Sequence, residues 1–432
     1  MNSNQSFQPD TPGLSAGFFS RNRAALLERL DDNCVVLLFS GLAPNRTADE
    51  DHLFFANRNF YYFTGIEQEE STLLIRKING NVQTELFIRQ RDDLAERWTG
   101  RRLRLEEASS VSGIENVQFL NGEKEQIDTT LTPPGISLYL DLQARDSQAV
   151  DFRCGAARQW PSTEIHDITP HITPLRMIKQ PEEIELIRQA ALLTNEGLEG
   201  IMRTARAGTW EYEAWAAFQY ALAKRNCLMP AFPTIIAAGE NSLCLHYMTP
   251  NSRIAENDVV QVDVGAIFGG LTADISRVYP ASGSFTARQK LLYEVVRECQ
   301  ETAFNTIQPG ILIHEVNEAC KQTAYKGLIR IGALMEGDDI NKCYWHNVSH
   351  HLGHDVHDPI SREIPLEPNM VLTVEPGLYV PEWGFGIRLE DDVLVTAGRC
   401  ELLSPSIPRE IEEVEELTQR LRSAAADTAC GL

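Results

Sequence analysis

Two segments of this chain alternate polar and apolar residues as strands do, and each doubles back at a turn rich in glycine or proline. In residues 258–265, valines alternate with polar residues, so Asp263 falls on the face opposite the valines. A hairpin turn between Phe268 and Gly269 would bring the chain back along this segment. Such a turn would place Asp263 directly opposite Asp274, on the same face of the hairpin.

The second segment repeats this arrangement with two glutamates. Residues 369–375 and 386–396 both alternate, and the connection between them contains proline and glycine. A turn near Glu382 would place Glu375 directly opposite Glu390. Side chains in such pairs lie roughly 4.5–5.5 Å apart, and like charges at that distance repel. A cation between them would turn repulsion into coordination, whereas a single pair could equally be ordinary solvated carboxylates.

A histidine cluster lies between the two pairs in the sequence. Half of the ten histidines fall within residues 346–357, at His346, His350, His351, His354 and His357. Four carboxylates with one imidazole make a mostly hard oxygen site, which favours Mn²⁺ over a thiolate-type zinc site. Two divalent ions about 3.5–4 Å apart are a recurring hydrolytic device, in which the ions share a water or hydroxide and polarise a carbonyl. We therefore expect a dinuclear metal centre that performs hydrolysis.

Other catalytic motifs find no support in the sequence. Residues 314–318 read His-Glu-Val-Asn-Glu, which begins like the HExxH motif of zinc proteases but lacks the second histidine. The sequence contains no GxSxG, no phosphate-binding P-loop and no GxGxxG. A serine hydrolase or a nucleotide-dependent enzyme is therefore not indicated.

Composition restricts the partners and the compartment. The net charge of -22 argues against a nucleic-acid partner, which requires a basic surface. No apolar run is long enough to span a membrane, and the first residues lack the basic and apolar layout of a signal peptide. The nine cysteines are an odd, scattered set without a CxxC motif. This usage is typical of reduced thiols, so we expect a cytoplasmic protein.

The chain is expected to form an N-terminal domain over residues 1–175 and a catalytic domain over residues 176–432. Strand-like runs in the first domain lie at residues 34–40, 61–66, 71–77, 84–90 and 136–142. Helices in the second are expected at about residues 181–204, 208–225, 286–308 and 313–329, with a solvated acidic helix at 409–423. With the two hairpins, the order is helix, helix, hairpin, repeated once. The expected fold class is therefore α/β, with a mixed-sheet domain followed by a pseudo-twofold repeat.

These residues resemble the pita-bread metallopeptidases, and within them the aminopeptidase P family. The resemblance covers most of the chain and keeps the order of the family's blocks. It is carried by LHYMTPN, VDVGAIFGGLTADISRVYP, SHHLGHDVHD, TVEPGLY and GIRLEDDVLVT in the catalytic part, and by NRNFYYFTGI and ERWTGRRL upstream. The resemblance implies an Xaa-Pro aminopeptidase, which removes the first residue of peptides that have proline second. Proline forms a tertiary amide, which peptidases that grip the backbone N–H cannot hold.

The resemblance also implies a set of metal ligands. Asp263 would chelate one ion, and Asp274 and Glu390 would bridge two divalent ions, expected to be Mn²⁺. His350 and Glu375 would complete the second ion. Glu375 would in addition move the proton from the bridging water to the leaving amine.

Further residues are implied to contact the substrate. His246 and His357 would stabilise the tetrahedral intermediate, and His346 would be another active-site histidine. Arg388 would lie near the proline end of the substrate. Trp98 would line the site of a neighbouring subunit, which implies a homodimer or homotetramer. Each also has a structural alternative: a histidine satisfied in the core, an arginine that neutralises acidic neighbours, or a tryptophan that packs a helix.

Two other functions fit parts of the pattern. A prolidase splits Xaa-Pro dipeptides with the same metals, and it differs only in whether the pocket admits chain beyond proline. A metal-free pita-bread protein that binds a peptide or protein partner would carry broken ligands. All five expected ligands are present in this sequence, which favours the enzyme.

Overall fold

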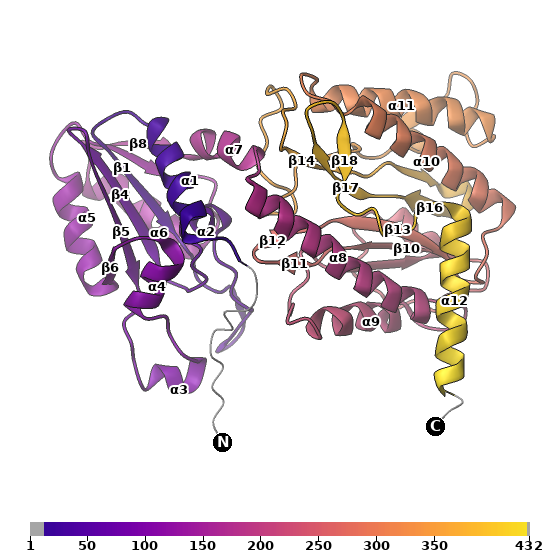
Figure 1. Cartoon of the computed structure of the whole chain (residues 1–432), viewed down its shortest axis with the longest axis horizontal. Helices are drawn as coiled ribbons and strands as arrows, with labels where there is room; N and C mark the ends of the chain where they lie inside the picture. Colours follow the sequence, from indigo (N-terminus) through magenta and orange to yellow (C-terminus); the bar gives the residue numbers. More distant parts are fainter. Residues whose placement is uncertain (1–12, 430–432) are drawn as a thin grey trace. The chain divides into compact units, whose positions relative to one another are not determined.

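The computed structural model describes residues 13–429, which divide into two compact units, residues 13–175 and residues 176–429 (Figure 1). The expectation that the first residues carry no signal peptide concerns residues 1–14, of which residues 1–12 lie outside the described range. Among residues 13–429, no helix combines the length and the apolar character needed to cross a membrane.

The N-terminal unit is built on a six-stranded mixed sheet. Its strands, in spatial order, are β6 (Asn116–Phe119), β5 (Asn81–Ile88), β4 (Thr72–Ile78), β1 (Cys34–Phe39), β7 (Ser137–Leu140) and β8 (Glu164–Asp167). Strand β1 pairs antiparallel with β4 and parallel with β7. The unit also contains β2 (Asn45–Thr47), β3 (Glu50–Asp51) and α3 (Ala95–Thr99), and α7 (Thr169–Met177) spans the boundary between residues 175 and 176.

Helices cover both faces of this sheet, which explains the uninterrupted apolar run of β1 (Figure 1). Val36 and Leu38 pack in one cluster with residues of α1 (Ala16–Glu28), α2 (Arg58–Thr64) and α4 (Leu105–Ser112). Val35 and Leu37 point the other way, into a cluster with residues of α5 (Glu123–Leu131) and α6 (Ser147–Gln159). A strand buried on both faces needs no alternation of polarity.

The strand predicted at residues 61–66 is wrong, because this segment belongs to helix α2. The Asn57 side chain accepts hydrogen bonds from the backbone N–H groups of Asn59 (2.9 Å) and Phe60 (3.1 Å), as an N-cap does. Gly65 then ends the helix with a φ of 69°. The aromatic residues of the segment favour strands only as a weak preference, which capping and burial overrode.

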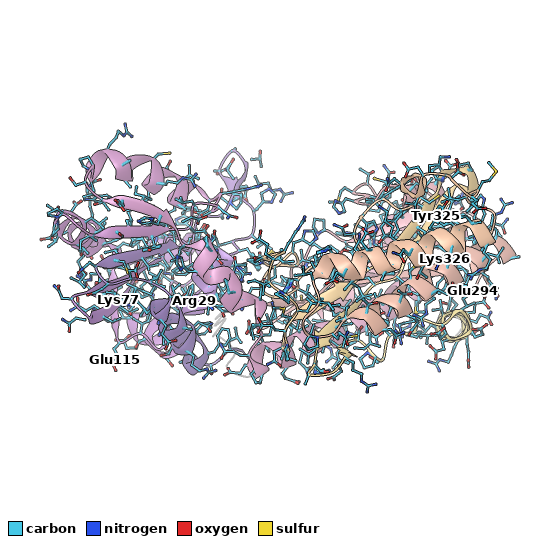
Figure 2. The ribbon with its side chains drawn as sticks, turned by 90° about the horizontal axis from the view of Figure 1, so that it is seen from above. Arg29, Lys77, Glu115, Glu294, Tyr325 and Lys326 are labelled. Atoms are coloured by element: carbon cyan, nitrogen blue, oxygen red, sulfur yellow. The ribbon has the colours of Figure 1, made fainter. Side chains whose placement is uncertain are left out.

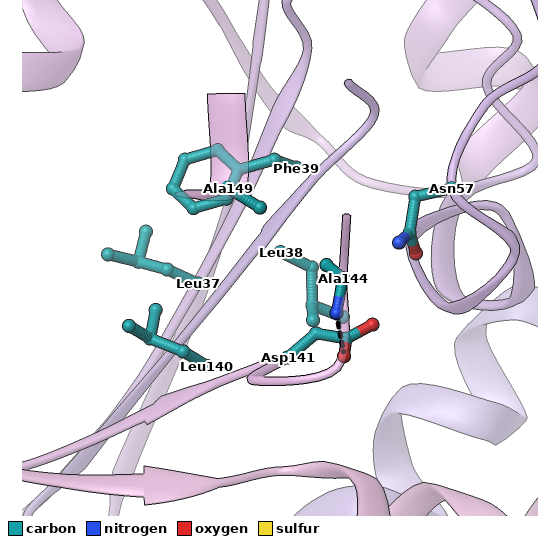
Figure 3. Close-up of a pocket in the computed structure, with 8 residues that line it drawn as sticks. All are labelled: Leu37, Leu38, Phe39, Asn57, Leu140, Asp141, Ala144 and Ala149. Carbon is teal, nitrogen blue, oxygen red and sulfur yellow. Dashed lines mark hydrogen bonds between the residues drawn. The ribbon is translucent and has the colours of Figure 1, made fainter. Parts of the chain in front are cut away.

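The carboxyl ends of β1 and β7 meet at a small crevice in this unit (Figure 3). It is lined by Leu37, Leu38, Phe39, Asn57, Leu140, Asp141, Ala144 and Ala149, and its volume is about 10 Å³. The Asp141 carboxylate accepts a hydrogen bond from the Ala144 N–H at 3.0 Å and so shapes one wall. Such a volume holds roughly one water molecule, so this crevice is not a substrate site.

The C-terminal unit contains two halves with the same order of elements. The first consists of α8 (Pro181–Thr204), α9 (Glu211–Ala223) and the sheet of β9 (Ile235–Ala238), β10 (Val259–Val264) and β13 (Ile275–Pro280), with the small hairpin β11 (Ile267–Phe268) and β12 (Leu271–Thr272). The second consists of α10 (Ala287–Thr306), α11 (Ile313–Arg330) and the sheet of β14 (Val371–Val374), β17 (Asp391–Val395) and β18 (Cys400–Leu402), with the hairpin β15 (Gly377–Val380) and β16 (Phe385–Arg388). Helix α12 (Ile411–Ala429) follows. The predicted mixed α/β fold, with helix, helix and hairpin repeated, is confirmed.

Local sequence signals set the ends of these helices. Thr286 and Gln289 form the predicted capping box of α10: the Thr286 N–H donates to the Gln289 side chain at 2.8 Å, and the Gln289 N–H donates to the Thr286 hydroxyl at 3.4 Å. Helices α10 and α11 pack side by side (Figure 2). A Cβ on Gly327 of α11 would lie 2.4 Å from a methyl of Val295 of α10. The missing side chain therefore sets the spacing of this helix pair.

Candidate metal centre

The first hairpin has a different register from the predicted one. Strand β10 pairs Asp263 with Ser276, so the predicted direct opposition of Asp263 and Asp274 is wrong. The turn falls between Gly269 and Gly270, one residue later than predicted, and both glycines have left-handed φ values of 57° and 85°. Either position within a glycine-rich turn is free of steric strain, so the sequence alone could not choose between the two registers.

Asp274 nevertheless approaches Asp263, because the strand is interrupted there. Residues 273 and 274 lie between β12 and β13 and belong to neither strand. The Ala273 N–H donates to the Ala266 carbonyl at 3.1 Å. A Cβ on Gly265 would lie 1.9 Å from the Ala273 carbonyl oxygen. The absence of a side chain at Gly265 thus lets the backbone segments at residues 265 and 273 approach closely, just where the two aspartates lie.

Substitution of Gly265 is expected to spread the two aspartates. In the Gly265→Ala variant, the added methyl would collide with backbone atoms, and a backbone cannot rotate away as a side chain can. We expect a loss of bound divalent metal, measured by elemental analysis after dialysis, with a melting temperature of the metal-free protein lowered by only a few degrees. Gly398→Ala is a matched control, because a Cβ there meets no atom within 4 Å. Normal metal content in Gly265→Ala would contradict the importance of this close approach.

The second hairpin has the predicted register. Strands β14 and β17, and then β15 and β16, pair along one continuous register. Between these two ladders the Leu389 N–H donates to the Pro376 carbonyl at 3.2 Å. Glu375 therefore lies opposite Glu390, as predicted.

His350 joins the carboxylates from the loop between α11 and β14. Its Nε2 lies 3.4 Å from Asp274 Oδ2 and 3.7 Å from Glu375 Oε1. Its other ring nitrogen, Nδ1, lies 3.0 Å from the carbonyl oxygen of the neighbouring His351. Asp274, His350 and Glu390 each present one ligand atom, all within 4.8 Å of one another. This spacing suits three donors around one metal ion.

Several carboxylate oxygens of the cluster are buried without a hydrogen-bond partner: Asp263 Oδ1, Asp274 Oδ1 and Glu390 Oε1. Burial, together with repulsion from Asp263, raises the pKa of Asp274 well above its usual range. Burial and the charges of Asp274 and Glu375 do the same to the pKa of Glu390. Burial also raises the pKa of Glu375, to about 7. Buried, unsatisfied carboxylates are unfavourable by themselves, so this donor set fits hard divalent cations.

A hydrogen-bonded chain runs beside the carboxylates. The Tyr379 hydroxyl lies 2.9 Å from His346 Nε2 and accepts a hydrogen bond from Arg388 Nη1 at 2.9 Å. Arg388 Nη2 forms an ion pair with Asp263 Oδ2 at 2.6 Å, and its Nε donates to the Ser276 hydroxyl at 2.9 Å. Sequence reasoning missed Tyr379 and Ser276. Tyr379 shares the alternating face of Glu375, so the predicted register already placed it there, whereas Ser276 lies across from Asp263 only in the observed register.

The other two predicted histidines also face this cluster. The rings of His350 and His357 meet edge to face, with centroids 4.4 Å apart. Burial lowers the pKa of His346 to about 4 and also lowers that of His357, and the charge of His246 contributes to both decreases. His246 is exposed and lies in the segment between Gly239–Leu243 and β10. The structure therefore brings His346 and His350 to within 3.5 Å and 3.7 Å of Glu375, with His357 packed against His350.

The remaining residues of the histidine cluster lie outside this group. His351 is buried and pairs its backbone with Leu372. His354 is buried too, with Nε2 3.3 Å from the Glu183 carboxylate and Nδ1 3.1 Å from the Gly270 carbonyl oxygen. Both histidines thus anchor the loop that carries His350.

Two acidic residues after Glu390 have structural contacts. Asp391 forms a fully buried ion pair with Arg277 at 2.7 Å. Asp392 accepts a hydrogen bond from the Asp274 N–H at 3.2 Å and so supports the interrupted strand. In the N-terminal unit, Trp98 lies in α3, and its side chain is 85% exposed.

Comparison with known proteins identifies the family. Residues 185–397 match metallopeptidase family M24, and residues 19–136 match the N-terminal domain of aminopeptidase P. The chain is 33% identical to an Xaa-Pro aminopeptidase of Escherichia coli, over 94% of this chain and 98% of that protein. It is 31% identical to an Xaa-Pro aminopeptidase of Haemophilus influenzae, over 92% of this chain and 96% of that protein.

Solved structures agree with this result. A Bacillus anthracis structure provisionally named aminopeptidase P superposes with a TM-score of 0.91 and 36% identity, over 94% of this chain and 99% of that one. Zinc-substituted Escherichia coli aminopeptidase P in complex with product gives a TM-score of 0.87 and 32% identity, over 95% and 99%. The chain therefore belongs to metallopeptidase family M24 and carries the N-terminal domain of the aminopeptidases P.

Proposed function

We propose that this enzyme hydrolyses the first peptide bond of peptides whose second residue is proline. The observation that carries this proposal is the cluster of Asp263, Asp274, Glu375, Glu390 and His350, in which Asp263, Asp274 and Glu390 are buried and each has one carboxylate oxygen without a hydrogen-bond partner. It is supported by similarity to Xaa-Pro aminopeptidases along nearly their whole length. The intact donor set argues against a purely binding protein, in which we would expect broken metal ligands.

The donor set would hold two divalent ions, for which Mn²⁺ is our proposal because the donors are mostly carboxylate oxygens. Asp263 would bind one ion, and His350 and Glu375 the other. Asp274 and Glu390 would bind both. When bound, such ions polarise the scissile carbonyl and lower the pKa of a water molecule.

The chain's own residues would move the proton. Glu375 is the proposed acceptor of the proton from the attacking water, and it would return that proton to the leaving proline nitrogen. His246 and His357 would donate hydrogen bonds to the oxygen that becomes negatively charged during attack. The ring of His357 packs against that of His350, and the charge of His246 lowers the pKa of His357, which supports this assignment.

Arg388 and His346 would hold the substrate beyond the scissile bond. Arg388 is buried and fixed by three partners, so its guanidinium is preorganised. The proline ring would pack near this end of the cluster. His346, held against Tyr379, would contact the substrate on the same side.

The N-terminal domain, residues 1–175, would restrict access to the site or build an oligomer, and residues 176–432 would form the catalytic domain. The exposed Trp98 is proposed to line the site of a neighbouring subunit in a homodimer or homotetramer. A reducing, cytoplasmic location would suit the eight free cysteines among residues 13–429.

Hydrolysis of two peptides by the same protein sample tests the proposal. Metal-stripped protein should cleave neither Arg-Pro-Pro nor Ala-Pro, and added Mn²⁺ should restore release of arginine from the tripeptide with little cleavage of the dipeptide. Cleavage of the dipeptide alone would make the enzyme a prolidase. Cleavage of neither peptide, despite bound Mn²⁺, would overturn the proposal in favour of another substrate or a binding role.

A further inference from the structure

The segment that carries His246 is held by a buried carboxylate outside the metal cluster. We infer that Glu211 is a positioning residue, which fixes His246 for the reaction. This inference rests on the proposed function. Glu211 is the first residue of α9, and its side chain is fully buried.

Both carboxylate oxygens of Glu211 accept two hydrogen bonds each. Oε1 accepts from the Ala238 N–H at 2.8 Å and from the Asn241 side-chain amide at 2.8 Å. Oε2 accepts from the Tyr247 hydroxyl at 2.9 Å and from the Ser252 N–H at 2.9 Å. All four donors belong to residues 238–252, which lie 27 to 41 positions after Glu211 in the sequence. One carboxylate therefore gathers the start, the middle and the end of this segment.

His246 lies inside the gathered segment. Apart from a short 3-10 helix at Gly239–Leu243, residues 239–252 form no helix or strand. Tyr247, which follows His246 directly, donates to Glu211 and accepts a hydrogen bond from the Asn241 amide at 3.1 Å. Since a loop without regular structure has no ladder to fix it, these bonds define where the His246 backbone lies.

A second contact ties the same segment to the metal-centre hairpin. The Ser242 hydroxyl accepts a hydrogen bond from the Gly386 N–H at 2.9 Å, two residues before Arg388. The segment is therefore held at one side by β16 and at the other by Glu211. Burial of a carboxylate is unfavourable unless hydrogen bonds to it compensate, and here four of them do. A carboxylate in this position serves to order the loop.

Substitution of Glu211 by glutamine should keep the fold intact but loosen the loop of residues 239–252. The glutamine carbonyl oxygen could still accept from Ala238 and Asn241, and its amide could donate to a rotated Tyr247 hydroxyl. The Ser252 N–H would then face an N–H donor and lose its partner. The stretch after His246 would therefore be released, while the metal ligands would keep their contacts.

The test compares Glu211→Gln with Glu213→Gln, both as the Mn²⁺-loaded enzyme acting on Arg-Pro-Pro. Glu213 lies in the same first turn of α9, but it is exposed, and within residues 13–429 its carboxylate accepts a hydrogen bond only from the Trp210 N–H. We expect Glu211→Gln to lower kcat by about tenfold to a hundredfold, because small misplacements of a catalytic group have effects of this size. Bound Mn²⁺ should be unchanged, and amide exchange should increase in peptides from residues 239–252. In a His246→Ala background the additional loss of kcat should be less than about twofold.

Different results would overturn the inference on Glu211 and the proposed function. A kcat equal to that of Glu213→Gln, or an undiminished loss in the His246→Ala background, would overturn the inference alone. A wild type that cleaves neither peptide would overturn the proposed function, and the inference with it. If Glu211→Gln does not fold, Tyr247→Phe replaces it, because it removes only one hydroxyl, which donates to Glu211 and accepts from the Asn241 amide. That variant must then lower kcat only when His246 is present.

Discussion

Glu390→Gln is expected to stabilise the metal-free protein, to destabilise the metal-saturated protein and to abolish hydrolysis. Metal-free Glu390→Gln should unfold at a higher temperature than the metal-free wild type, and the metal-saturated variant at a lower temperature than the metal-saturated wild type. Hydrolysis of Arg-Pro-Pro should fall by at least about a thousandfold, because charge stabilisation by the ions is worth several kcal/mol.

These opposite effects on stability follow from the charges buried in the site. Burial, followed by the charges of Asp274 and Glu375, raises the pKa of Glu390 well above its usual range. A carboxyl group whose pKa is raised by folding opposes folding at any pH above its unfolded pKa, where the unfolded chain ionises more readily. Removal of the Glu390 charge should therefore increase the stability of the metal-free protein at pH 7. In the wild type, metal at a hundred times its Kd should add about 2.7 kcal/mol.

Thermal unfolding with and without Mn²⁺, together with elemental analysis, measures both effects. Glu382→Gln is the matched control, because Glu382 is an exposed glutamate in the same hairpin. It should leave the metal response and the activity unchanged. A metal-free Glu390→Gln protein less stable than the metal-free wild type would mean that the carboxylate has a favourable structural role, and the electrostatic account would fail.

The alternating pattern predicted which face each carboxylate occupies, but it predicted register only where the turn was unambiguous. Glu375 and Glu390 lie opposite each other as expected, since Pro381 and Gly384 fix the turn between them. The Asp263 hairpin turns one residue later than expected, because Gly269 and Gly270 allow either centre. Same-face placement survived this error because a one-residue shift of the turn moves the partner of Asp263 by two residues, from Asp274 to Ser276, and residues two apart in a strand share a face.

Residues whose role depends on distant partners had no signal in the sequence. Glu211 reads as an ordinary first-turn glutamate of a helix, and only the folded chain shows that it gathers residues 238–252. Tyr379 reads as a strand residue, although its hydroxyl joins His346 to Arg388. Local propensity and periodicity describe neighbours along the chain, so contacts between separate elements lie beyond them.

The largest effect on stability is expected from Asp358→Asn, at the base of the loop that carries His350 and His357. Asp358 is buried between two buried cations: its Oδ1 lies 2.5 Å from Arg176 Nη2, and its Oδ2 lies 3.0 Å from Lys179 Nζ. Without this carboxylate, two positive charges would remain in the interior with little compensation. Loss of one partner of a buried ion pair typically costs about 3–5 kcal/mol. Asp355→Asn is the matched control, because that carboxylate also contacts Arg176 at 2.7 Å but is 43% exposed, so its loss should cost about 1 kcal/mol or less.

The pH dependence distinguishes a charge effect from a packing effect. Burial alone would raise the pKa of Asp358, but Arg176 and Lys179 beside it hold this pKa well below its usual range. A carboxylate with a lowered pKa stabilises the protein above the unfolded pKa and loses this contribution as the pH falls toward the folded pKa. The stability difference between wild type and Asp358→Asn should therefore be constant from about pH 7 to pH 5 and shrink progressively below that. Amide exchange in urea, read from peptides of residues 176–429 in metal-free protein, gives this difference at each pH. A difference that persists undiminished at pH 3 would show that Asp358 acts through its shape and hydrogen bonds, and that its charge is not what secures the loop.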